Sequence, residues 1–88
     1  MIWDTIETAA DALSPLTATA DACLALGMKY CLGHGVAQSN IEAHKWFNLA
    51  AMKGSEKARS YRLELAREMS ADDVAEAQRQ ARTLLTIH

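Results

Sequence analysis

The chain has 88 residues and a formal net charge of −2, with nine basic side chains scattered among eleven acidic ones. No basic stripe is available to neutralise phosphates, which argues against nucleic-acid binding, and no apolar run is long enough to cross a bilayer. The length predicts one domain over residues 1–88, and abundant alanine with few glycines and one proline favours an all-α fold. The acidic N-terminus lacks the positive charge of a signal peptide, so we expect a cytoplasmic location.

Residues 1–14 come first in chain order, and two interpretations of them are open. Ile2, Ile6, Ala10 and Leu13 recur at helical spacing, which predicts a short amphipathic helix. Chain ends are often loosely attached, so the same residues can also form an arm without fixed structure.

The next helix is expected over residues 16–32, as the first half of a helix pair that ends at Gly54. Ser14 followed by Pro15 suits a helix start, because proline at the first helical position sacrifices no hydrogen bond. Gly33 is a suitable C-cap because glycine tolerates a positive φ.

The second helix of the pair is expected over residues 39–53, where Ser39 can cap the N-terminus and Glu42 can complete a capping box. We expect Trp46 to be largely buried against the preceding helix, near Gly27 and Tyr30. The full buried stripe is predicted to comprise Ala43, Trp46, Phe47, Ala50 and Ala51, and a second apolar side to comprise Ile41, Leu49 and Met52.

Residues 55–88 are expected to close the fold as two capping helices, over residues 55–69 and 71–85. Ser55 and Ser70 are N-cap candidates. Arg62 lies on an otherwise apolar stripe, so its head should reach water or pair with an acid, namely Glu64, Glu68 or Asp11. The two inner stripes comprise Ala58, Tyr61, Leu65 and Met69, and then Val74, Ala77, Ala81, Leu84 and Leu85.

Residues 22–54 resemble a Sel-one-like repeat of the bacterial type, a relative of the tetratricopeptide repeat. The resemblance rests on Ala22, Leu26-Gly27, Tyr30, Gly33, Gly35-Val36, Ala43, Trp46, Ala50-Ala51 and Gly54. A second unit would begin at Ala58, but Arg62, Leu63 and Ala66 replace the leucine, glycine and tyrosine of the first. The resemblance implies a short α/α solenoid: one repeat over residues 16–54 and a degenerate capping pair over residues 55–88.

The two cysteines and two of the three histidines are candidates for a metal site or for catalysis. Cys23 and Cys31 are eight positions apart on one predicted helix, roughly 12 Å, which is too far for a disulfide. Cys31 and His34 have metal-like spacing, with His44 or Cys23 as further candidates, but a second close ligand pair is missing. Cys31 near a helix C-terminus is poorly placed for a nucleophile paired with His44. We therefore expect no catalytic residues, no metal and no cofactor.

The favoured function is a protein–protein interaction module without catalytic activity. In solenoids of this kind the first helix of each pair lines a concave face that binds a protein or peptide. Two alternatives stay open: a metal- or redox-responsive switch using Cys23, Cys31 and His34, and an enzyme whose site forms only between subunits. The expected partner face combines apolar and basic side chains, namely Met28, Lys29, Leu32, Arg59, Leu63 and Arg67.

A homodimer is also possible. One repeat and a degenerate cap can leave apolar surface uncovered, since arrays usually need about three units. Ile41, Leu49 and Met52 are the surface that a second copy would cover, and two-fold dimers are the commonest symmetric solution.

Overall fold

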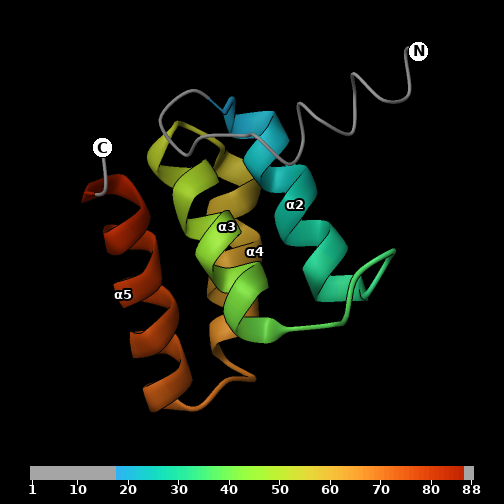
Figure 1. Ribbon diagram of the computed structural model, residues 1–88, viewed down its shortest axis with the longest axis vertical. Helices are drawn as coiled ribbons and strands as arrows, with labels where there is room; N and C mark the ends of the chain where they lie inside the picture. Colours follow the sequence, from blue (N-terminus) through green and yellow to red (C-terminus); the bar gives the residue numbers. More distant parts are fainter. Residues whose placement is uncertain (1–17, 87–88) are drawn as a thin grey trace.

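The computed structural model describes residues 18–86, which fold into four α-helices with no strand in that part of the chain. Successive helices run antiparallel (Figure 1). The predicted all-α class is confirmed, whereas the two interpretations of residues 1–14 lie outside the described residues. The helices are α2 (Ala20–Leu32), α3 (Asn40–Met52), α4 (Glu56–Ala66) and α5 (Ala71–Thr86).

Serine hydroxyls mark three of the four helix starts, as predicted. The side chains of Ser39, Ser55 and Ser70 each accept a hydrogen bond of 3.1 Å from the backbone N–H three residues later. Each bond satisfies one of the N–H groups that a helix N-terminus leaves without a partner. The capping box at α3 is only half formed, because the Glu42 carboxylate pairs with Lys45 Nζ at 2.8 Å.

The predicted start of α2 at residue 16 was wrong. Thr19 is the N-cap, with an extended backbone (φ −73°, ψ 162°), and its hydroxyl accepts a 3.0 Å hydrogen bond from the N–H of Ala22. The Thr19 hydroxyl satisfies one of the free N–H groups at the helix start, so the helix begins after Thr19 and not after Ser14-Pro15. The other end of α2 agrees with prediction: Gly33 has φ 72° and donates to Lys29 O at 2.8 Å.

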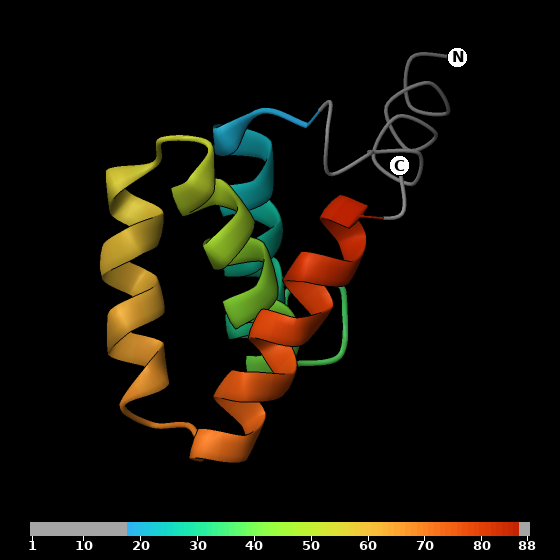
Figure 2. The same ribbon diagram turned by 90° about the vertical axis from the view of Figure 1, so that its left-hand side faces the viewer.

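α3 is the central helix of the described chain. It contacts α2, α4 and α5, whereas direct contacts among those three helices are few. α4 and α5 lie on opposite sides of α3 (Figure 2). Most of the surface of α3 is therefore covered by other helices, and side chains on more than one of its faces are buried.

The aromatic residue that lies against Gly27 in the α2–α3 contact is Phe47, and not Trp46 as predicted. A Cβ atom placed on Gly27 would lie 2.4 Å from Phe47 Cδ1, so the absence of a side chain at Gly27 makes room for this ring. Phe47 is 1% exposed and stacks on Tyr61, with ring centroids 5.5 Å apart. Trp46 is half-buried at the edge of the core, with Lys45 Nζ 5.7 Å from its ring centroid.

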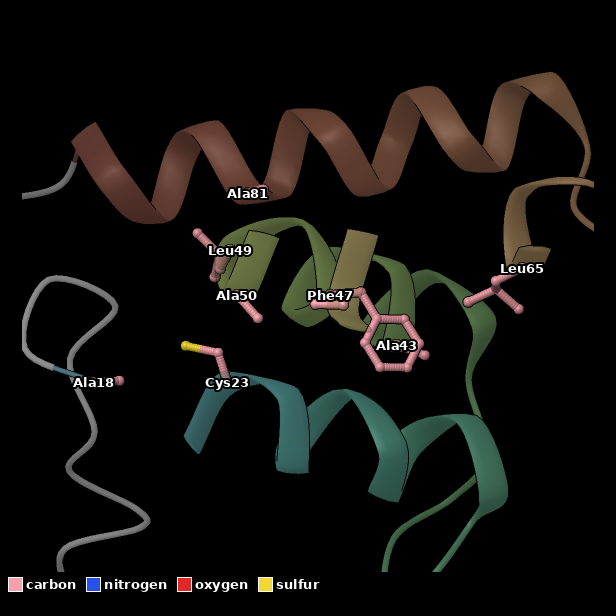
Figure 3. Packing of buried hydrophobic residues seen from close by; sticks show 9 residues of the cluster. Ala18, Cys23, Ala43, Phe47, Leu49, Ala50, Leu65 and Ala81 are labelled. Atoms are coloured by element: carbon pink, nitrogen blue, oxygen red, sulfur yellow. The ribbon is translucent and has the colours of Figure 1, made fainter. Parts of the chain in front are cut away.

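The second apolar side of α3 is partly covered within the chain. Leu49 is buried and belongs to one core cluster with Ala81 of α5 (Figure 3). Ala77 and Ala81 are small enough for α5 to approach α3 closely. Ile41 is half-buried and Met52 is exposed, so only Leu49 of the three residues that a second copy was expected to cover is buried within the chain itself.

Candidate partner-binding surface

Three residues of the expected partner face form one stripe along α4. Arg59, Leu63 and Arg67 follow one another at four-residue spacing, which places them on the same side of a helix. All three are exposed, and Leu63 is 55% exposed. Arg67 is the C-cap residue and keeps a helical backbone (φ −66°, ψ −24°), so it continues the stripe. We call Arg59, Leu63 and Arg67 the α4 stripe.

The α4 stripe has acidic neighbours. Glu56 and Glu64 are both exposed and stand three residues before Arg59 and Arg67, respectively. The surface of α4 is therefore mixed in charge. The stripe thus offers a partner one apolar side chain between two guanidinium groups and not a net positive field.

The three residues of α2 in the expected partner face differ in their exposure. Lys29 and Leu32 are exposed, with Leu32 at 55%. Met28 is half-buried and packs against the core, so the expectation that it would be exposed was wrong. The reason is the width of the α2 contact, in which Leu24 and Cys31 also pack against the core.

The exposed residues of α2 and those of α4 do not form one continuous face, because the two helices do not pack along each other. α2 and α4 each pack on α3 and have little direct contact with one another. Lys29 with Leu32, and the α4 stripe, are therefore two exposed surfaces bridged by α3. A concave face of the expected kind would have α2 packed along α4.

A polar cluster between α3 and α4 was missed by the sequence reasoning. Arg62 of α4 donates from Nη1 to the Asn48 side-chain oxygen at 2.7 Å, so its partner is a neutral amide and not an acid. Glu64 and Glu68 are exposed, and Asp11 lies outside the described residues. His44 stands one helical turn before Asn48, and this i, i+4 pair of polar residues was the signal available in the sequence. We call His44, Asn48 and Arg62 the polar cluster.

His44 is the buried polar residue of this cluster, at 1% exposure. Its Nδ1 atom has no hydrogen-bond partner among the described residues. Burial, and to a lesser degree the charge of Arg62, lowers the pKa of His44 below its ordinary value of 6.5, against a smaller opposing effect of its own backbone carbonyl. The imidazole is therefore neutral near pH 7.

The two thiols are free and differ in environment. Cys23 is fully buried, and burial raises the pKa of its thiol despite the opposing charge of Lys53. A raised pKa disfavours the thiolate, which is the form that attacks substrates and binds metals. Cys31 is half-buried on the same helix. Within residues 18–86 no three histidine, cysteine or acidic side chains are grouped as metal ligands would be.

A hollow of about 300 Å³ lies between α3 and α5. Lys45 and Arg79 line it, but each is already paired with a carboxylate, Lys45 with Glu42 and Arg79 with Glu76. These pairs neutralise the positive charge that an anionic ligand would need. The remaining lining residues are Gln80, Thr83 and Leu84.

Neither the lengths of the helices nor comparison with known proteins assigns this chain to a functional class. Within the described part of the chain, every helix is too short or too polar to cross a bilayer. No protein-family model, curated protein or solved structure matches the chain.

Proposed function

We propose that this protein is a cytoplasmic protein–protein interaction module, a short α/α solenoid of the Sel-one-like kind, without catalytic activity of its own. The observation that carries the proposal is the α4 stripe, in which Leu63 is 55% exposed between Arg59 and Arg67. An exposed leucine leaves apolar area that contact with a partner protein would bury favourably.

The arrangement supports a partner that offers an apolar side chain and carboxylates together. Leucine supplies apolar contact area, and each guanidinium supplies a bidentate hydrogen-bond fork for a carboxylate. A peptide or a helix of another protein provides such groups at the required spacing. Lys29 and Leu32 on α2 repeat the combination of one cation and one exposed leucine, and they are the second contact region of this proposal.

A comparative pull-down tests the proposal with three baits. The wild-type chain, the double variant R59E/R67E and the control K57E are used against one bacterial lysate, and bound proteins are quantified by mass spectrometry. Lys57 is exposed on α4 but off the stripe, so K57E reports the effect of charge reversal alone. We expect a protein that K57E retains and R59E/R67E loses, with similar melting temperatures for all three chains.

The candidate is then purified, and its affinity is measured with the same three chains and with L63D. Loss of binding in L63D and R59E/R67E, but not in K57E, supports the α4 stripe as the contact. Equal retention of every captured protein by all three baits contradicts the proposal.

A further inference from the structure

The polar cluster is a buried group of polar side chains for which the proposed function has no use. His44 of α3 is 1% exposed, its Nδ1 has no hydrogen-bond partner among the described residues, and the charge of Arg62 of α4 acts on its ring. Arg62 reaches the same side of α3 from α4 and donates to Asn48, one turn from His44. The interface therefore holds one permanent positive charge beside a titratable ring.

We propose that the α3–α4 interface is pH-sensitive: protonation of His44 weakens the packing of α4 on α3. A protonated ring would introduce a second positive charge close to Arg62. It would also give the buried ring a second N–H donor, for which the described residues offer only the weak acceptor of the histidine's own backbone carbonyl. Both effects penalise the docked state and disappear when water reaches the ring.

Within residues 18–86, Arg62 of α4 is the charged side chain that acts on the His44 ring, and no carboxylate in that range does so. The polar side chains of α2 that pack in or on the core include Cys23, Tyr30 and Cys31, none of which is a carboxylate. α5 packs through buried Ala77 and Ala81, and its Glu76–Arg79 ion pair lies near the surface. On α3 itself Lys45 is paired with Glu42.

α4 is the helix that such a change can release. Its buried residues are Ala58 and Leu65, and its packing within the described chain is mainly against α3. α2 is held by a wider contact, in which Gly27 lies against the Phe47 ring. Acid should therefore open α4 before it opens α2.

The direction of the pH effect follows from proton linkage. A histidine with a pKa below its unfolded value binds fewer protons in the docked state than in the open state. The docked state is then fully stable above about pH 6.5 and weakens as the pH falls below it. The opening constant rises at most about tenfold per pH unit, and the rise stops below the pKa of docked His44.

Amide hydrogen exchange is measured from pH 7.5 to pH 5.5 and corrected for the effect of pH on the intrinsic exchange rate. This experiment tests the pH-sensitive interface. The expected result is an opening constant for α4 that rises several-fold below pH 6.5, with little change in α2. H44Q should abolish the rise, whereas H34Q should keep it, because His34 is exposed in the loop after α2. Equal opening of α2 and α4, or a pH response unchanged in H44Q, would overturn the proposal.

A second pair of variants keeps the test decisive if H44Q does not fold. R62K retains the positive charge and R62Q removes it. In NMR titrations the midpoint of His44 should move upward in R62Q and stay near the wild-type value in R62K, with a weaker acid response of α4 in R62Q. An unchanged midpoint in R62Q, or a wild-type midpoint at or above 6.5, would show that His44 does not act in this way.

Discussion

Replacing Gly27 with alanine tests the closest helix contact of the fold. A Cβ atom at this position would lie 2.4 Å and 2.5 Å from two carbons of the Phe47 ring. Ordinary carbon–carbon contacts are about 3.5–4.0 Å, so the ring or the helix must move by roughly 1 Å. The ring is 1% exposed and stacked on Tyr61, which leaves it little room to yield.

Two opposing terms set the expected size of the effect. Overpacking a core typically costs about 1–3 kcal/mol. Alanine is a better helix former than glycine by about 1 kcal/mol, which offsets part of that cost. We therefore expect Gly27→Ala to lower the free energy of unfolding by up to about 2 kcal/mol, and not to raise it. Each kcal/mol corresponds to about 4–8 °C in melting temperature for a domain of this size.

Urea denaturation followed by circular dichroism measures the change. Ala25→Gly is the matched control, because Ala25 is an exposed residue of the same helix and this change reports the propensity term alone. In a Phe47→Leu background the steric term should shrink, giving a coupling of at least about 0.5 kcal/mol between the two positions. A Gly27→Ala variant stabilised by the full propensity gain would refute the contact between Gly27 and Phe47.

Three further predictions follow from the same structure. Ser39→Ala should lower stability by about 0.5–2 kcal/mol, because the cap of α3 is lost, and denaturant unfolding measures this directly. Phe47→Ala should cost about 3–5 kcal/mol and Trp46→Ala clearly less, because only the phenylalanine is fully buried; the reverse order would contradict the assignment. Hydrogen bonds from Arg79 first, and then from Gln80, lower the pKa of Glu76 from 4.5 to about 2. Any stability this gives is present above pH 4.5 and lost as the pH falls toward 2; an NMR titration midpoint near 4.5 would show that the pair does not persist in solution.

The sequence by itself determined the class of the fold and most helix ends. Ser39, Ser55 and Ser70 accept the hydrogen bonds expected of N-caps, and Gly33 ends α2 with a positive φ. These features depend on groups within a few residues of one another, so local chemistry is sufficient to predict them. The exposure of Leu63 could also be predicted, because helical spacing places it opposite the buried stripe of α4.

Only the tertiary structure decided which residues of α3 are buried and what they contact. Periodicity finds the apolar side of a helix, but it does not reveal how many partners surround it. Because α2, α4 and α5 all pack on α3, Leu49 and His44 are buried as well as Phe47, and Trp46 is left at the edge of the core. The neutral partner of Arg62 likewise depends on how α4 packs on α3, since Asn48 is fourteen residues away in sequence.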